Sequence, residues 1–544
     1  MGNRAVYVLI AVVTVAAIGL LWGSSIPLGV PSEWEWNRIQ YPGGLGAVMI
    51  ESALALIVSI FLIGYAWLGL RRIERCSGAE RFGWLIGLVA IGVAWMISVQ
   101  ESTPPTYRMT KAAWVLYYPG ASGYYFNARY DYPNTDEFLG GYEDRMKEGD
   151  YLHVGTHPPG LFVVYRGIIN FLNGNPAAVE AVLQTQTESF SAAFDVIEEN
   201  NRASRGLKPE DRATIWLAVL LTHLVAALTV IPLFALLRQE FSAQTAWASI
   251  CFWPAIPSIC IFLPKSDALY PLIAATFIYF WVKGFRDRSW SEFLIAGLVA
   301  WLGMFFSLAM LPTLAVAGLL TLIHLKKLVE SERSENNPDA DDATQKPSPS
   351  LWSGPLKAIA FAVAGFIAPC LVLLFVWKIN LAAVWYYNFI NHESFYDAFE
   401  RTYAKWLGVN AIEIMIAMGG PLGVLAVSST WTKSALTRSK ASDFQGVWPC
   451  LAVWMLLWLS GKNNGEAARL WIILLPGAIW MAAYRLDAMF EEADSDKETK
   501  PHPLAAWFCL LILQAFVCVA TTMRVTGFSL PGPVEWLKRL DEIF

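Results

Sequence analysis

Residues 53–75, ALALIVSIFLIGYAWLGLRRIER, decide the fold class of this chain. Residues 53–70 carry no charged side chain, and Arg71, Arg72 and Arg75 follow directly. A helix needs about 20 apolar residues to cross the hydrocarbon core of a bilayer, and arginines at one end favour the cytoplasmic side. The apolar run, extended back to residue 44, therefore predicts a transmembrane helix that ends in the cytoplasm.

The composition of the whole chain excludes a soluble protein. Of its 544 residues, 56% are hydrophobic and only 16% are charged, and the mean hydropathy is +0.42. Soluble proteins average about 25% charged residues, so this chain has too few charges to cover its apolar surface with polar groups. The formal net charge of −5 provides no basic face for a nucleic acid. We therefore expect a membrane protein without a nucleic-acid partner.

The apolar runs are continuous rather than alternating, which predicts membrane helices instead of barrel strands. We expect an all-α polytopic membrane protein with about thirteen transmembrane helices. The sequence leaves open whether 290–325 is a single helix kinked at Ser307 and Pro312, and 446–460 is short for a span. The thirteen candidate spans are residues 5–23, 44–70, 83–99, 213–237, 244–263, 267–284, 290–305, 307–325, 356–378, 408–428, 446–460, 468–485 and 504–523.

The lysines and arginines of the short connections orient the chain. With Arg4 inside, every second connection is basic, which predicts a cytoplasmic N-terminus and an exterior C-terminus. The basic residues of these connections are Arg71, Arg72, Arg75, Arg81, Arg238, Lys283, Arg286, Arg288, Lys326, Lys327, Lys433, Arg438, Lys440 and Arg485. The chain then divides into membrane helices (1–99), a large exterior loop (100–212), membrane helices (213–325), a cytoplasmic polar linker (326–355), membrane helices (356–523) and an exterior tail (524–544).

The exterior loop 100–212 is the longest connection, and loops of this length are usually functional or disordered. Its many aromatic residues predict a folded segment, with interfacial helices at about 158–173 and 176–200. Within it, Asp136-Glu137 opens a helical turn, Gly149-Asp150-Tyr151-Leu152 follows, and Thr156-His157-Pro158-Pro159-Gly160 leads into an apolar run. This order of motifs marks the loop as the candidate site.

These motifs resemble the first exterior loop of the GT-C superfamily of membrane glycosyltransferases, closest to the protein O-mannosyltransferase and aminoarabinose transferase branch. The resemblance covers about 30 residues locally, and the topology extends it along the chain. It implies that Asp136, with Glu137 beside it, is the catalytic carboxylate. It also implies a sugar donor on a polyprenyl phosphate, and inversion at the sugar. The enzyme would reside in the plasma (inner) membrane, with its active face exterior or periplasmic.

The chain departs from the family pattern because two extra spans precede the acidic pair. Glu101 stands where an acid directly after a span is expected, and Asp131 lies close to the pair. Both remain alternatives to Asp136 as the base. The sugar and the acceptor, whether glycan, lipid or protein, stay open.

Glycosyl transfer to a hydroxyl needs a base for the acceptor proton and cationic partners for the leaving phosphate. The exterior connections supply such cations, and Arg suits a bidentate phosphate contact. The candidates for binding the donor phosphate are Arg469, Lys265 and Lys462. Glu466 lies three positions before Arg469, which places both side chains on the same face of a helix. The candidates for contact with the substrates are His157, Asp267, His392, Glu393 and Glu466. The third exterior loop, 379–407, carries His392 and Glu393.

Two other function classes compete with the enzyme. A transporter or lipid flippase would distribute charged residues through the spans, whereas here they concentrate at one face. A polymerase or ligase of surface polysaccharide shares the lipid-phosphate chemistry. No metal-ligand cluster is evident, and dependence on a divalent metal stays open.

Overall fold

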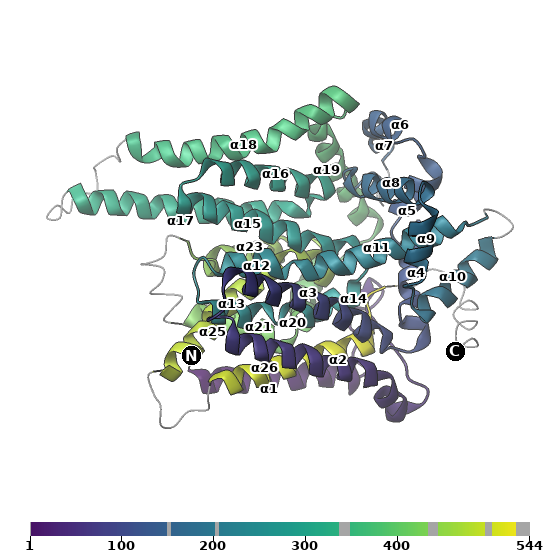
Figure 1. Ribbon diagram of the computed structural model, residues 1–544, viewed down its shortest axis with the longest axis horizontal. Helices are drawn as coiled ribbons and strands as arrows, with labels where there is room; N and C mark the ends of the chain where they lie inside the picture. The colour runs from purple at the N-terminus through teal and green to yellow at the C-terminus, as the bar shows by residue number, and fades with distance from the viewer. Residues whose placement is uncertain are drawn as a thin grey trace.

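The computed structural model describes residues 2–149, 154–201, 206–336, 349–432, 444–494 and 503–528, and most of these residues are helical (Figure 1). Within this part of the chain, ten helices are long and apolar enough to cross a membrane. They are α1 (Asn3–Trp22), α2 (Gly44–Arg72), α3 (Gly78–Glu101), α11 with α12 (Pro209–Leu228, Val230–Leu237), α13 with η3 and α14 (Ala243–Ile250, Trp253–Ala255, Pro257–Phe262), η4 with α15 (Ser266–Leu269, Tyr270–Asp287), η5 with α17 (Leu308–Met310, Leu311–Asn336), α18 (Pro349–Trp377), α24 with η7 and α25 (Ala467–Leu470, Trp471–Leu474, Leu475–Asp494) and α26 (Pro503–Arg524). The expectation of an all-α multi-pass membrane protein is confirmed.

All thirteen apolar runs of the sequence lie in helices. Two of them form helices shorter than the ten above, α16 (Trp290–Phe306) and α23 (Val447–Ser460). Ser307 ends α16, and its side chain accepts a hydrogen bond from the Ala309 amide at 3.1 Å. Helix α16 packs against α15 and α18, while α17 packs against α23. Residues 290–325 therefore form two helices, not one kinked helix.

The run predicted as one span at 408–428 is broken. Helix α20 (Tyr403–Met418) and α21 (Gly420–Ser428) meet at an angle of 109°. Gly419 between them has a φ of +81°, and a Cβ at this position would lie 2.5 Å from the Gln514 amide nitrogen. Only glycine fits both the left-handed backbone and the close approach. If the pair is counted as one span, the described chain has up to eleven.

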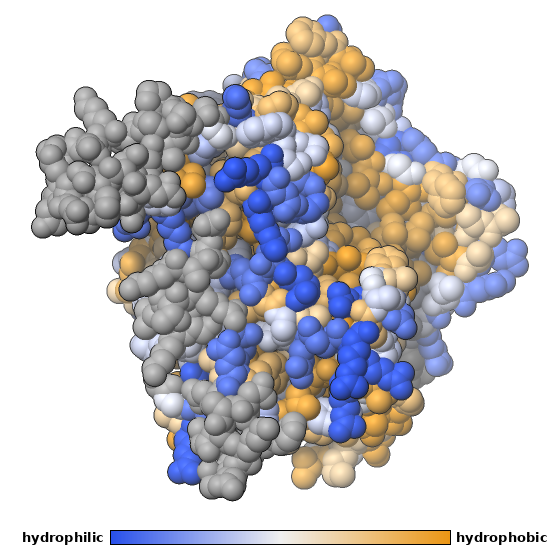
Figure 2. Space-filling model, turned by 60° about the vertical axis from the view of Figure 1, so that its left-hand side comes forward, coloured by the Kyte–Doolittle hydropathy of each residue, from blue (hydrophilic) through white to orange (hydrophobic). Residues whose placement is uncertain are grey.

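The helices differ in how deeply they are buried. The segment Ala243–Phe262 is wholly buried and Ala467–Glu491 largely so, whereas Gly44–Arg72 and Gly354–Trp377 expose most of their apolar side chains. Figure 2 shows broad hydrophobic areas on the flank of the molecule, with hydrophilic residues gathered on the end that faces the viewer. An exposed apolar flank is expected where lipid tails, rather than water, surround the protein.

The predicted exterior loop is a folded helical segment at one end of the bundle, opposite the start of α1 (Figure 1). Phe138, Tyr142, Phe162 and Tyr165 form much of its buried aromatic core. Its elements are η1 (Pro105–Tyr107), α4 (Thr110–Tyr117), α5 (Tyr124–Phe126), η2 (Asn127–Asp131), α6 (Thr135–Gly140), α7 (Tyr142–Lys147), α8 (Gly160–Asn173), α9 (Pro176–Leu183) and α10 (Glu188–Asn201). The helix expected at 158–173 is confirmed as α8, but 176–200 forms two helices rather than one.

Two further connections complete this end of the molecule. The connection 379–407, expected as a loop, is mostly the helix α19 (Leu381–Ala398). Short strands β1 (Gly29–Val30) and β2 (Trp34–Glu35) form a pair, and β3 (Asn37–Arg38) pairs with β4 (Val525–Thr526) after α26. The connection between α1 and α2 is thereby attached to the end of α26. The predicted linker 326–355 is in part helical, because α17 continues to Asn336 and α18 begins at Pro349. Its middle part, 337–348, the basic residues Lys433, Arg438 and Lys440 and most of the tail lie outside the described residues.

Candidate functional site

A cavity of about 590 Å³, here called the main cavity, lies where the α4–α10 segment meets the bundle. Its wall combines the Thr156–His157 turn before α8, the η4 turn, the start of α17, α19, the end of α23 and the connection from Gly461 to α24. Eight of the residues singled out in the sequence line it: His157, Lys265, Asp267, His392, Glu393, Lys462, Glu466 and Arg469. Segments that are far apart in the sequence thus meet at one site.

The charged floor of the cavity is built by two turns. After Pro264 the chain turns, with the Lys265 amide bonded to the Phe262 carbonyl at 2.8 Å, and η4 begins at Ser266. On the other turn, Nη2 of Arg469 lies 2.8 Å from Glu466 Oε1. Nε of Arg469 lies 3.8 Å from Asp267 Oδ2, and the arginine side chain is only 19% exposed. Two carboxylates therefore hold the guanidinium in place where it can meet an anion.

Lys265 is a second cation on this floor, in the turn between two candidate spans. Burial, and then the neighbouring charge of Arg469, lower the pKa of Lys265 to about 7. Its amine lies 6.0 Å from the ring centre of Phe528. A bound anion would favour the charged amine, so the site is suited to couple anion binding to proton uptake.

Another part of the wall is formed by the Thr156–His157 turn. The Asn388 and Asn391 amides on α19 donate to the Gly155 carbonyl at 3.0 and 2.9 Å, and Tyr142 Oη donates to the His157 carbonyl at 2.5 Å. The His157 ring packs edge-on against Tyr124, with ring centres 5.7 Å apart. These contacts hold the Thr156–His157 turn in place, and the two asparagine contacts come from α19.

Two further titratable groups of α19 line the cavity. His392 has a lowered pKa, first because it is buried and then because Lys462 lies nearby. Glu393 is exposed at the rim. His392 therefore favours the neutral form, which can both donate and accept a hydrogen bond.

One side of the main cavity is apolar. It is lined by apolar residues of η5 and α17 (Leu308, Leu311, Pro312 and Ala315) and of α23 (Val453, Leu456 and Leu457). Leu311 is 47% exposed and Leu456 is 66% exposed, so the apolar wall reaches the outer surface of the bundle. The cavity is thus polar at the floor and apolar toward the surrounding lipid.

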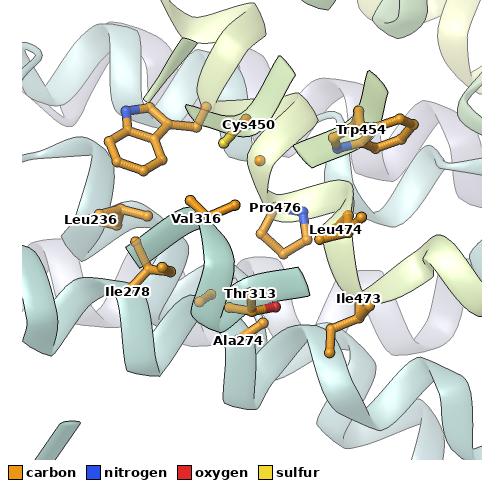
Figure 3. Close-up of a pocket in the computed structure, with 13 residues that line it drawn as sticks. Leu236, Ala274, Ile278, Thr313, Val316, Cys450, Trp454, Ile473, Leu474 and Pro476 are labelled. Atoms are coloured by element: carbon orange, nitrogen blue, oxygen red, sulfur yellow. The ribbon is translucent and has the colours of Figure 1, made fainter. Parts of the chain in front are cut away.

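A separate void of about 30 Å³ lies deeper between α15, α17, α23 and α25 (Figure 3). Ile473 and Leu474 line both this void and the main cavity. Thr313 is the one hydroxyl on its wall, while Leu236, Ile278, Val316 and other apolar side chains make up most of the rest. The charged lining of the main cavity does not continue into this part of the bundle.

The predicted carboxylates of the exterior loop lie elsewhere. Asp136 is exposed at the start of α6, where its Oδ1 accepts a hydrogen bond from Trp377 Nε1 at 3.0 Å. Glu137 is exposed beside it, and Asp131 accepts from Asn127 Nδ2 at 2.7 Å. Glu101 accepts from Ser189 Oγ at 2.6 Å. None of these four described acids lines the main cavity.

Sequence reasoning missed several polar residues of the cavity wall, including Tyr124, Thr156, Asn388 and Asn463. Tyr124 lies in the aromatic stretch that predicted a folded loop, which is the signal that could have marked it. Burial raises the pKa of Tyr124 well above its usual value, so its phenol stays a neutral hydrogen-bonding group. Among the described residues, no cluster of three or more His, Cys, Asp or Glu could hold a metal ion.

Comparison with known protein families and with curated protein sequences finds no match to this chain.

Proposed function

We propose that the protein is an integral-membrane glycosyltransferase that moves a sugar from a polyprenyl-phosphate donor to an acceptor hydroxyl at the exterior face. One observation carries the proposal, namely that the main cavity joins a floor with partly buried cations to an apolar wall that reaches the lipid surface. A lipid phosphate needs both surfaces at once, one for its charge and one for its chain.

The proposed roles follow from position. Arg469 and Lys265 on the floor bind the donor phosphate and stabilise the charge that develops on it as the sugar leaves. Lys462, whose amine lies 5.7 Å from the Phe389 ring centre, attracts the donor at the rim. The sugar and acceptor hydroxyls meet the polar wall: His157, His392 and Glu393.

The proposal includes the topology. We infer thirteen crossings, with the N-terminus in the cytoplasm and the main cavity on the exterior face of the plasma membrane. The distribution of Lys and Arg supports this orientation. A cysteine introduced by Lys147→Cys should react with an impermeant maleimide on intact cells, and one introduced by Arg286→Cys only after permeabilisation; the reverse pattern contradicts the orientation.

A transporter or flippase is the alternative of a different class. Such a protein needs a polar path through the bundle. The small void below the main cavity is lined mostly by apolar side chains, which favours chemistry at one face over passage across the membrane. A polysaccharide polymerase or ligase uses the same lipid-phosphate chemistry and differs only in the acceptor.

The test is a reconstitution of the full chain in proteoliposomes with synthetic polyprenyl-phosphate sugars. We expect donor-dependent release of polyprenyl phosphate, and we expect Arg469→Ala to weaken donor binding by about 10- to 100-fold, the effect of about 1.5–3 kcal/mol for a hydrogen bond to a charged group. Arg469→Lys should be less damaging because one charge remains.

Lys147→Ala is the matched control for Lys265→Ala, because Lys147 is half exposed and pairs with Asp144 outside the cavity. Loss of donor binding in Lys265→Ala but not in Lys147→Ala supports the proposed site. If the wild-type protein neither binds nor turns over any lipid-phosphate sugar, the function is not glycosyl transfer. Movement of labelled donor across the bilayer without sugar transfer would support the flippase instead.

A further inference from the structure

The proposed reaction needs a base for the acceptor proton, and the three carboxylates of the main cavity differ in their fitness for it. Glu466 is occupied by its 2.8 Å ion pair with Arg469. Glu393 lines the cavity from α19 and is exposed to solvent. Asp267 lies on that floor, and its side chain is only 14% exposed.

The carboxylate of Asp267 is the one that remains open to a ligand. Its closest cation is Arg469, with Nε at 3.8 Å, which is beyond hydrogen-bonding distance. Among the described residues, no donor forms a hydrogen bond to either of its oxygens, and neither oxygen is sealed from solvent. A carboxylate in this state can accept a proton without first losing a hydrogen bond.

Asp267 also has the right neighbours. Lys265 precedes it by two residues on the same turn, and both residues line the cavity with Arg469. A phosphate bound by these two cations therefore lies beside Asp267. An acceptor hydroxyl that attacks the sugar of this donor must approach through the same cavity.

We propose that Asp267 is the catalytic base of the proposed glycosyl transfer, in place of the exterior-loop acid Asp136. This assignment rests on the proposed function. The acceptor oxygen forms a bond to the anomeric carbon while the bond from that carbon to the phosphate oxygen breaks. The electron pair of the broken bond stays on the phosphate, which Arg469 and Lys265 stabilise. The acceptor proton passes to Asp267 and then to water, so the products are the glycosylated acceptor, polyprenyl phosphate and one proton.

Asp136 has a different role in this account. Its carboxylate accepts the Trp377 indole at 3.0 Å, and Glu143 of α7 accepts the Asn380 amide at 2.6 Å. Both contacts fasten α6 and α7 to the junction of α18 and α19. Asp136 is therefore a positioning residue for the α4–α10 segment.

The experiment compares Asp267→Asn, Asp267→Glu and Asp136→Asn in proteoliposomes, with donor binding and turnover measured separately. We expect Asp267→Asn to lower turnover by about 100- to 10,000-fold, the usual contribution of general base catalysis. Donor affinity should stay within about threefold of wild type, because the proposed phosphate ligands Arg469 and Lys265 are unchanged. Asp267→Glu keeps the base and should retain part of the turnover. Asp136→Asn should stay within about threefold of wild type.

The pH dependence of turnover distinguishes a catalytic role of Asp267 from a structural one, because the loss of a purely structural residue would not change the shape of the pH profile. We expect an acidic limb in the acceptor kcat/KM that disappears in Asp267→Asn. The assignment is overturned if Asp267→Asn keeps the wild-type rate, if it loses donor binding together with turnover, or if Asp136→Asn abolishes turnover with binding intact. Absence of any donor binding in the wild type overturns the proposed function itself, and the base with it.

Discussion

At the scale of single residues, the site depends on charges held away from water. Lys265, Asp267, Glu466 and Arg469 line one cavity from two turns that are about two hundred positions apart in the chain. Burial makes each charge costly unless a partner of opposite sign compensates it. Glu466 compensates the charge of Arg469, whereas Lys265 can lose its own charge because its pKa is lowered to about 7. A bound anion would therefore compensate the positive charge that remains in the site.

Lys265 gives a prediction on pH. Its pKa is lowered to about 7 in the free protein, so the amine loses its charge as the pH rises through 7. A bound phosphodiester stays anionic and raises the pKa of Lys265 again, so binding takes up a proton above pH 7. Donor affinity should fall by up to about tenfold per pH unit from pH 7 upward.

Titration of donor binding between pH 6 and 9 checks this, and calorimetry in buffers of different ionisation enthalpy counts the proton. Lys265→Arg serves as the control, because a guanidinium stays charged throughout this range and should remove the slope. A flat profile in the wild type contradicts the role given to Lys265.

At the scale of elements, the presence of each membrane helix was predictable from the sequence. Where a helix ends and which other helices it packs against were not. Each apolar run of the sequence predicts a helix, because whether a segment can cross a bilayer depends mainly on the composition of that segment. The break at Gly419 depends on the close approach of Gln514 from another helix, which no local pattern contains. The connection 379–407 was expected as a loop but forms α19, whose Asn388 and Asn391 bind the backbone before α8.

The support of the His157 turn by α19 gives a second prediction. Asn391 donates from one amide to the Met146 carbonyl at 3.0 Å and the Gly155 carbonyl at 2.9 Å, and it does not line the main cavity. Asn391→Leu leaves both carbonyls without this donor, which costs about 1–3 kcal/mol. We expect a lower midpoint of thermal unfolding and a higher acceptor KM, with donor affinity unchanged because Lys265 and Arg469 lie on other elements.

Asn170→Leu is the matched control, since Asn170 is exposed on α8 and should change neither property. Unaltered acceptor kinetics in Asn391→Leu would show that the turn needs no support from α19.

At the scale of the whole molecule, the charged residues of the main cavity were predictable from the sequence, but the position of Asp136 outside the cavity was not. Lys265, Lys462 and Arg469 stand out in the sequence because they lie in or next to the predicted exterior connections, where Lys and Arg are scarce. The order of motifs favoured Asp136 as the catalytic acid. In the structure, Asp136 instead binds Trp377, which lies 241 positions away in the sequence. Motif order thus identified the segment that covers the cavity, while the three-dimensional packing decides which acid enters it.

The last prediction concerns access from the membrane. Leu311 of α17 and Leu456 of α23 line the main cavity and are exposed at the flank of the bundle, so a prenyl chain bound at the polar floor would leave between them. Leu456→Trp narrows this opening. We expect it to raise the KM for a long-chain donor about tenfold, the effect of losing roughly two buried methylene contacts at about 0.8 kcal/mol each.

A water-soluble short-chain donor needs no such opening, so its KM should not change in Leu456→Trp. Leu54→Trp on the exposed face of α2 is the control for a bulky substitution in contact with lipid, and we expect it to leave both donors unaffected. The comparison of two chain lengths separates the phosphate site from the path of the chain. Equal effects on both donors would mean that Leu456 acts on the polar floor; no effect on either would mean that the chain leaves the cavity by another side.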